Sequence, residues 1–344
     1  MQTIWFCFVA FMIVMYVLLD GFDLGVGILH RFVARSDEER RMALATIGPV
    51  WDGNEVWLLA AGGTLYFAFP LLYASAFSGF YLPLNMVLWL LMGRGISIEL
   101  RSHLEAPIWR SLWDSIFVLS SFLLALFFGV ALGNVVRGVP LDESGRFFAP
   151  MWLGGRHSVG VLDLYTVLVG LTAVVALTLQ GASWLNLKTS GPVQHRSQRT
   201  IGTLVPVQLL LTLVLTVVTF RIQPVILQHL NAQPWRYVFP LLALAGLCGL
   251  FWFPRRGGER STFYASCAYL AGMLGAVVAG VYPLVLPALD ETGMSLNIHN
   301  AAAPLSGLRL GLYWWIPGML IAMAYSSWMY RKFAGKVGQG ETSY

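Results

Sequence analysis

Charged residues are scarce in this sequence. Of its 344 residues only 11% are Asp, Glu, Lys or Arg, whereas 57% are hydrophobic and the mean hydropathy is +0.67. Soluble domains carry about 25% charged residues, so the composition excludes an ordinary soluble globular protein. The net charge of +5 would otherwise suggest a nucleic-acid partner. In a membrane protein, however, basic residues mainly signal orientation.

Cysteine is equally scarce. Cys7, Cys248 and Cys267 all lie within apolar runs, and no CxxC spacing occurs. We interpret them as small buried hydrophobic residues and not as disulfides or metal ligands. The first residues also lack the basic start and the small-residue cleavage site of a signal peptide. We therefore expect them to form a retained transmembrane helix.

Histidine is absent from the middle of every long apolar run. A haem held between membrane helices normally needs an inward-facing histidine, sometimes paired with methionine. We therefore expect this chain to ligate no haem, which argues against a self-sufficient cytochrome. No HExxH, phosphate loop or paired-metal spacing appears either, so no metal site is predicted. The six histidines are His30, His103, His157, His195, His229 and His299.

Long apolar runs dominate the remainder of the chain. Runs of about 17 to 25 apolar residues are typical of membrane-spanning helices. The sequence predicts nine, in one all-α membrane domain over residues 1–344 that ends in a short basic tail, 331–344. A tight link near Tyr73 to Ala76 predicts that the second and third runs form an antiparallel hairpin. The runs cover approximately residues 3–29, 55–73, 76–95, 115–136, 161–184, 201–221, 237–253, 262–282 and 310–330, with the longest connections at 33–51, 137–160 and 283–309.

The basic residues predict the orientation of these helices. The loops after the odd-numbered runs, together with the C-terminus, hold sixteen Lys or Arg residues, against six at the N-terminus and in the other loops. Cytoplasmic loops are enriched in Lys and Arg. We therefore expect the N-terminus outside and the C-terminus in the cytoplasm. This pattern accounts for the net charge, and no nucleic-acid partner is needed.

Two aspartates near the end of the first run form the first candidate site. Asp20 and Asp23 are three residues apart and share one helix face. At a rise of about 1.5 Å per residue they lie near the inner edge of the hydrocarbon layer. They are either interfacial carboxylates or the acidic entrance to a proton path. The glycines Gly21, Gly25 and Gly27 should let another helix approach this segment closely.

The stretch PVWDGNEVWLL provides the second candidate site. Asp52 and Glu55 have the spacing of a capping box, with Asp in place of Ser or Thr, at the start of the second run. The predicted orientation also places them on the same inner face as the first two aspartates, and four carboxylates are more than helix caps require. Both interpretations stay open. The motif residues beside them are Trp51, Gly53, Asn54 and Trp57.

Few polar residues occur elsewhere in the runs. Arg94 ends the third run, and Glu99 and Arg101 follow within about two turns. We expect most such residues to form hydrogen bonds between helices. Further examples are Asn85, Asn134 and Gln180.

Several motifs together resemble subunit II of the cytochrome bd-type quinol oxidases. They occur in the family's order across roughly the first 190 residues, and beyond them the likeness is mainly one of helix number and hydropathy. The motifs are DGFDLGVG, IGPVWDGNEVWL, FSGFYLPL, LRSHLEAPIWRSLWD, VALGNVVRGVP and LQGASWL.

The resemblance implies a complex that oxidises quinol and reduces dioxygen to water in a bacterial or archaeal cytoplasmic membrane, without pumping protons. It implies a heterodimer with a pseudosymmetric subunit I, which carries two haems b and one haem d, and small accessory subunits are possible partners. Subunit II would support haem insertion and help to supply cytoplasmic protons. The catalytic groups would then lie outside this chain.

The resemblance also assigns roles to individual residues. By motif, Asp23 and Asp52 inherit the proton-carrying role, whereas the position of Glu55 need not be acidic in the family. Arg94 and the terminal Tyr344 are expected to border the Asp23 route. The alternative is a secondary transporter that uses the four inner carboxylates for proton coupling. A transporter would favour inverted repeats and broken helices at the midplane, and no such repeat is evident.

Overall fold

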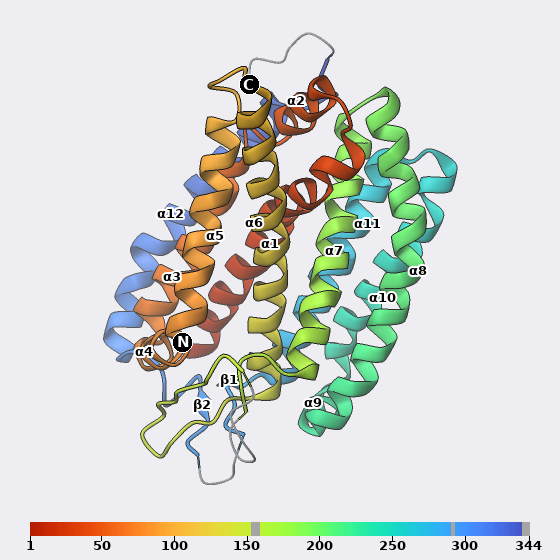
Figure 1. Ribbon diagram of the computed structural model, residues 1–344. Helices are drawn as coiled ribbons and strands as arrows, with labels where there is room; N and C mark the ends of the chain where they lie inside the picture. Colours follow the sequence, from red (N-terminus) through yellow and green to blue (C-terminus); the bar gives the residue numbers. More distant parts are fainter. Residues whose placement is uncertain (153–158, 290–292, 339–344) are drawn as a thin grey trace.

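The computed structural model describes residues 1–152, 159–289 and 293–338. Within them the chain is almost entirely helical (Figure 1). Short 3₁₀ turns, η1 (Pro234–Tyr237) and η2 (Pro254–Arg256), flank α10. The helices are α1 (Gln2–Val33), α2 (Asp37–Ala45), α3 (Trp51–Ala68), α4 (Pro70–Gly79), α5 (Tyr81–Leu100), α6 (Pro107–Arg137), α7 (Leu164–Lys188), α8 (Gly191–Ile222), α9 (Pro224–Ala232), α10 (Val238–Trp252), α11 (Glu259–Val281) and α12 (Leu305–Lys332).

Seven helical segments in the described part of the chain are long and apolar enough to cross a membrane. They comprise α1, α5, α6, α7, α8, α11 and the segment Pro234–Arg256 around α10. Two further helices, α3 and α12, occupy the positions of the second and ninth predicted runs, but their hydropathy falls short of that of the other seven. The prediction of an all-helical fold is therefore confirmed, and seven of the nine predicted runs lie in helices that are long and apolar enough to span a membrane.

The predicted tight hairpin between the second and third runs is wrong. Residues Tyr73 to Ala76 are helical and lie inside α4, a helix of ten residues that separates α3 from α5. Pro70 is the first residue of α4 and disfavours helical geometry at Phe69, which adopts φ −134° and ψ 66°. Because α4 is itself apolar, the sequence does not distinguish it from the end of a spanning helix.

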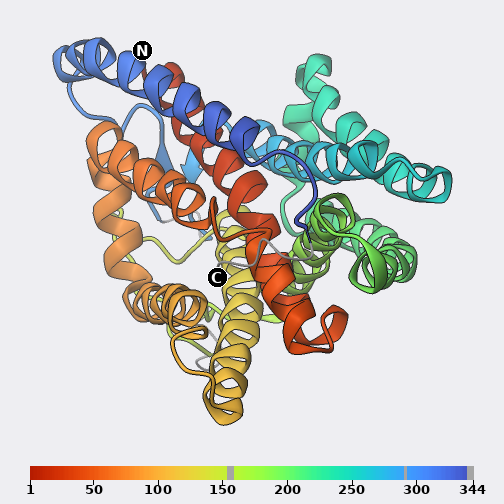
Figure 2. The ribbon, with the colours of Figure 1, turned by 90° about the horizontal axis from the view of Figure 1, so that it is seen from above.

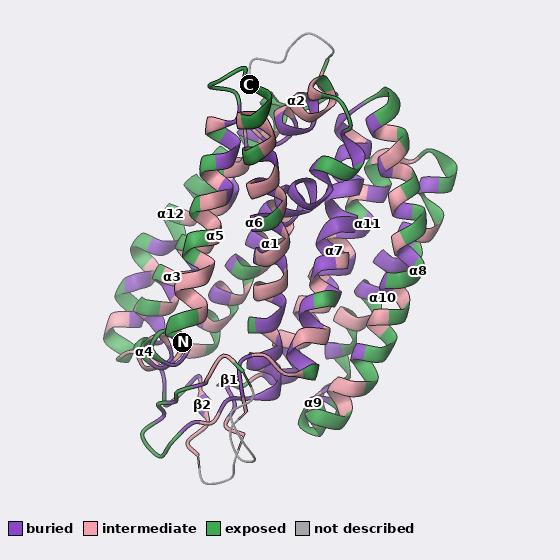
Figure 3. Cartoon of the chain, in the orientation of Figure 1, coloured by how far each residue is buried: buried purple, intermediate pink, exposed green. Residues whose placement is uncertain are grey.

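Two helices form the centre of the molecule. α1 packs against α3, α6 and α7, and α7 packs in addition against α8 and α11. α10 packs mainly on α11, and α5 packs mainly on α6 (Figure 2). Buried residues are concentrated on α1 and α7, whereas α8, α10 and α12 present many exposed residues to the outside (Figure 3). This arrangement places the acidic segment of α1 inside the bundle.

Contact between α1 and α7 depends on glycine. A Cβ atom at Gly25 would lie 2.0 Å from the carbonyl oxygen of Leu177 and 2.7 Å from the Cα of Gly181. The two backbones can approach this closely only because neither position carries a side chain. The neighbouring glycines also face other helices: Gly21 lies against Leu177 and Gln180 of α7, and Gly27 lies against Phe117 and Ser121 of α6.

The two ends of the bundle differ. At one end, which we call the α2 end, the last turns of α1 and α12 lie with α2, a helix that the sequence did not predict within the 33–51 connection (Figure 1). At the other end, the 283–309 connection contains a two-stranded antiparallel ladder of β1 (Leu284–Leu286) and β2 (Leu296–Asn297). Together with α2 this ladder is the main departure from the predicted connections.

Replacing Gly25 with alanine should force α1 and α7 apart. Overpacking a tight contact typically costs about 1–3 kcal/mol, so we expect Gly25→Ala to lower the thermal midpoint of the detergent-solubilised protein. The control is Gly62→Ala on α3, where an added Cβ meets nothing within 4 Å. Equal midpoints for Gly25→Ala and Gly62→Ala would show that this close approach is not required.

Candidate functional site

A buried ion pair joins α1 to α5. The guanidinium of Arg94 donates two hydrogen bonds to Asp20, with Nη1–Oδ2 at 2.8 Å and Nη2–Oδ1 at 2.7 Å, and both side chains are fully buried. Glu55 of α3 lies nearby, with its Oε1 3.5 Å from Arg94 Nη2. One cation therefore faces two carboxylates. The two-pronged geometry holds Asp20 more tightly than Glu55.

Asp23 lies one turn along α1 and has neutral partners. Asn54 of α3 donates from Nδ2 to Asp23 Oδ2 at 2.7 Å and to the Leu19 carbonyl at 3.2 Å. The hydroxyl of Tyr330, on α12, donates to Asn54 Oδ1 at 2.6 Å. Asp23 and Asn54 are each 1% exposed, and among the described residues Asp23 forms no ion pair. Two neighbouring aspartates of one motif thus lie in different electrostatic surroundings.

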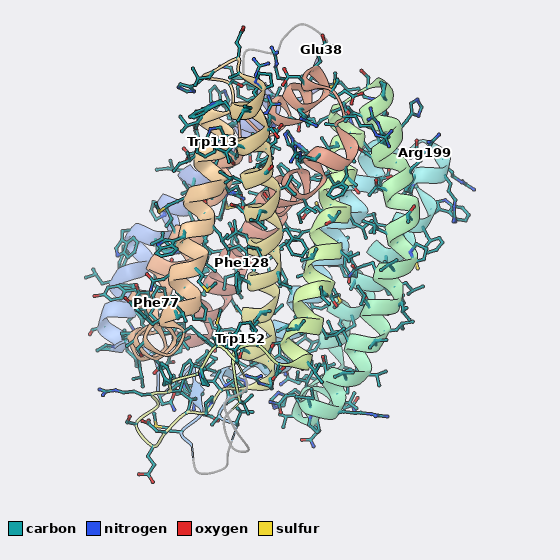
Figure 4. All side chains as sticks on the ribbon, viewed as in Figure 1. Glu38, Phe77, Trp113, Phe128, Trp152 and Arg199 are labelled. Atoms are coloured by element: carbon teal, nitrogen blue, oxygen red, sulfur yellow. The ribbon has the colours of Figure 1, made fainter. Side chains whose placement is uncertain are left out.

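Three buried polar atoms of this cluster have no hydrogen-bond partner among the described residues. They are the hydroxyl of Tyr16, Oδ1 of Asp23 and Nε of Arg94. Tyr16 precedes Asp20 by one helical turn and packs edge-on against Phe128, with ring centroids 5.6 Å apart. Phe128 is labelled about midway along the bundle in Figure 4. The cluster therefore extends from near the α2 end into the interior and offers positions for bound water.

Asp52 lies outside the buried cluster. It occupies the first turn of α3 and is exposed, and no hydrogen bond or ion pair involves its side chain in the described part of the chain. The predicted capping box is wrong, because the helix begins at Trp51 and the N-cap residue is Val50, which makes no side-chain cap bond. The carboxylate of Asp52 still lies near the positive end of the dipole of α3.

The other motif residues of α3 contact neighbouring helices. Trp51 lies against Gly95 of α5, and Gly53 faces Met329 of α12. Trp57 is buried and meets Phe11 of α1 edge-on at 6.1 Å. These contacts fix α3 between α1, α5 and α12, which positions Asn54 and Glu55.

The remaining predicted residues differ in how far they are buried. Glu99 is exposed at the end of α5, whereas Arg101 is buried. Tyr344 lies outside the described residues. Residues 333–337 lie against the end of α7, where Lys188 Nζ donates to the carbonyls of Phe333 and Gly335.

Arg101 belongs to an ionic network that the sequence did not predict. Fully buried Asp114, the only carboxylate in α6, accepts from Arg101 Nε at 2.5 Å and from Arg40 Nη1 at 3.0 Å, and His30 Nε2 lies 2.7 Å from it. Arg101 also binds Asp37 of α2, at 2.8 Å. The sequence feature that could have indicated this network is a single aspartate, Asp114, at the start of an apolar run. The network joins α1, α2, α5 and α6 near Trp113 (Figure 4).

Asp37 lies outside the spanning helices. Partial burial raises the pKa of its carboxyl group, but hydrogen bonds from Arg41 and Arg101 outweigh this effect and leave the pKa below its usual value. Asp37 is therefore ionised at neutral pH and holds α2 against the ends of α5 and α6.

The polar residues expected to join helices do so in part. Gln180 Nε2 donates to the Leu18 carbonyl at 2.8 Å, which links α7 to α1. Asn134 Nδ2 donates to the carbonyls of Val130 and Val161. Asn85 donates within its own helix, to Tyr81.

No group of three or more His, Cys, Asp or Glu side chains among the described residues could hold a metal ion. The buried histidine on α1, His30, has its Nε2 engaged with Asp114. The carboxyl groups and tyrosine hydroxyls of the cluster are of the kind that bind and transfer protons.

Comparison with known proteins gives consistent matches. The family model for cytochrome bd terminal oxidase subunit II matches residues 1–333. A probable cytochrome oxidase subunit 2 of Haemophilus influenzae is 30% identical over 371 aligned positions, covering 98% of this chain and 95% of that protein. The cytochrome bd-I ubiquinol oxidase subunit 2 of Escherichia coli K12 is 30% identical over 367 positions, with coverage of 98% and 95%. The cytochrome bd ubiquinol oxidase subunit 2 of Bacillus subtilis is 28% identical over 337 positions, with coverage of 96% for both.

A solved structure shares the fold. A chain of the bd oxidase from Geobacillus thermodenitrificans superposes with a TM-score of 0.76 at 17% sequence identity, covering 96% of this chain and 98% of that chain. The likeness extends over nearly all helices described above.

Removing one partner of the Asp20–Arg94 pair should be far more damaging than removing both. Breaking a buried ion pair costs about 3–5 kcal/mol because one charge is left unpaired. We therefore expect Arg94→Gln to reduce thermal stability strongly in detergent, and Asp20→Asn combined with Arg94→Gln to recover much of the loss. Additive effects of the two substitutions would contradict a coupled pair.

Proposed function

The chain belongs to the cytochrome bd terminal oxidase subunit II family, and from this premise we propose that it delivers cytoplasmic protons to a haem-bearing subunit I. The complex would oxidise a quinol, of the ubiquinol class named for the Escherichia coli and Bacillus subtilis relatives, and reduce dioxygen to water. This chain would ligate no haem. Its second proposed role is to support haem insertion into subunit I. Family membership argues against the proton-coupled transporter.

The observation that carries the proton role is the contrast between Asp20 and Asp23. Asp20 is held in a buried ion pair by two hydrogen bonds from Arg94. Asp23 has only the neutral amide of Asn54, and its Oδ1 is buried without a partner in the described part of the chain. A buried carboxyl group without a cation avoids a large desolvation cost by binding a proton. Asp23 can therefore accept and release a proton, whereas Asp20 serves to hold Arg94.

Asp52, which is exposed near the α2 end, has a second proposed role, the collection of protons at the membrane surface. An unpaired carboxylate at the membrane surface can collect protons from water, and reduction of dioxygen consumes them. Glu55 lies one turn further along α3, half-buried, and 3.5 Å from Arg94. Asp52 and Glu55 thus form a possible sequence of proton-binding groups from the surface to the cluster.

The distribution of basic residues supports an orientation with the α2 end in the cytoplasm and the N-terminus outside. In this orientation Asp52 meets the cytoplasm, and Tyr16 is the innermost polar residue of the cluster. The haems b and d would be held by the pseudosymmetric subunit I, and small accessory subunits could join the heterodimer. The complex would lie in a bacterial cytoplasmic membrane.

Replacing Asp52 with asparagine keeps the shape of the side chain and removes its proton-binding group. We expect Asp52→Asn to lower oxygen consumption by the purified complex severalfold while its reduced-minus-oxidised haem spectrum is retained. Glu38→Gln, another exposed carboxylate at the α2 end, is the matched control. Normal turnover in Asp52→Asn would remove this residue from the proton path, and loss of haem would indicate a role in assembly.

The corresponding change at Asp23 should give a milder defect. Because Asn54 can still bond to an amide oxygen, Asp23→Asn should preserve the fold but slow proton uptake from the cytoplasmic face. The measurement is pH-indicator absorbance in the oxidase reconstituted in liposomes, after a pulse of oxygen. Uptake at the rate of the unsubstituted complex would show that Asp23 carries no protons.

A further inference from the structure

A cavity of about 260 Å³ lies at the α2 end, close to Tyr330. Its walls come from three distant parts of the chain: the end of α2 with the residues before α3, the last turn of α7, and the end of α12 with the tail. A water molecule occupies about 30 Å³ in the liquid, so the cavity can hold several. Its lining includes Ala45, Lys188 and Tyr330.

The chain segment after α12 covers this cavity. Lys188 donates to the carbonyls of Phe333 and Gly335, and the Val337 amide donates to the Lys188 carbonyl at 2.8 Å. Lys336 forms an ion pair with Glu259 at 2.8 Å. These bonds hold residues 333–337 over the cavity, although most of these residues are themselves exposed to solvent.

Tyr330 separates the cavity from Asp23. Its side chain lines the cavity, and its hydroxyl donates to Asn54, whose amide donates to Asp23. An amide has N–H donors and a carbonyl acceptor but no readily released proton. Asn54 is therefore a positioning residue that orients the Asp23 carboxyl group. The bonds from Tyr330 through Asn54 to Asp23 therefore do not by themselves carry a proton from the cavity to Asp23.

We propose that the cavity beneath residues 333–337 is the cytoplasmic water entrance to Asp23, and that Tyr330 is its gate and positions Asn54. The inference rests on the proposed proton role of Asp23. This entrance is distinct from the Asp52 surface, because Asp52 is exposed on α3 and does not line the cavity. The chain would then admit protons to one buried cluster from two places at the α2 end.

A cysteine in the cavity tests the entrance. Ala45→Cys in the intact complex is treated, in inside-out membrane vesicles, with a charged membrane-impermeant methanethiosulfonate reagent. We expect labelling to lower oxygen consumption to the level of Asp23→Asn. Ser190→Cys, exposed at the start of α8 and outside the cavity, is the matched control and should be labelled without loss of activity. The unsubstituted complex, treated in parallel, accounts for native cysteines.

The outcomes separate the two proposals. No labelling of Ala45→Cys, or labelling with unchanged oxygen consumption while Asp23→Asn is defective, overturns the entrance and leaves the proposed function standing. Normal proton uptake by Asp23→Asn overturns both.

Tyr330→Phe tests the gate, since it keeps the ring and removes only the hydroxyl. Loss of one hydrogen bond should change the proton-uptake rate roughly twofold to tenfold and shift its dependence on pH, with the haem spectrum unchanged. Tyr325→Phe is the control, because Tyr325 lies on the same helix and is 56% exposed. Identical uptake rates and pH profiles for the two variants overturn the role of Tyr330.

Discussion

The ion pair between Asp20 and Arg94 is the constraint on which the acidic cluster depends. Inside a helical bundle neither charge can remain without a partner, because taking an ion out of water costs several kcal/mol. α5 packs mainly on α6, so the Arg94 side chain must cross to α1 to reach its partner. The bond thereby fixes the helix that carries the DGFD motif with respect to α5, and Glu55 of α3 completes the surroundings of the same cation.

The ion pair also gives different partners to Asp20 and Asp23, the two aspartates of the DGFD motif. Asp20 takes both guanidinium nitrogens that face the cluster, and Asp23 is left with an amide. An acidic side chain that titrates during turnover must be able to lose its charge at small cost, and a neighbour with fixed positive charge prevents this. The proposed assignment of the mobile proton to Asp23 therefore rests on the position of Arg94.

A second ionic network supports the α2 end. Asp114 and Asp37 hold the ends of α1, α5 and α6 to α2 through a shared partner, Arg101. Lys188 holds the tail to the end of α7. These contacts shape the α2 end of the bundle, which carries Asp52 and the cavity and which is proposed to face the cytoplasm.

Composition and hydropathy were enough to predict the membrane class and the approximate positions of the long helices. The DGFD and WDGNEVW motifs, and the absence of histidine from the centres of the apolar runs, could also be identified from the sequence. These features follow from composition and local periodicity. Local patterns also misled: α4 resembles part of a spanning helix, and Asp52 resembles a helix cap. The packing of the helices was needed to show that Asp20 pairs with Arg94 and Asp23 with Asn54. It was also needed to show the contacts of Tyr330 and Asp114. These partners are tens to hundreds of residues apart, and contacts at that separation depend on helix packing, which no local pattern encodes.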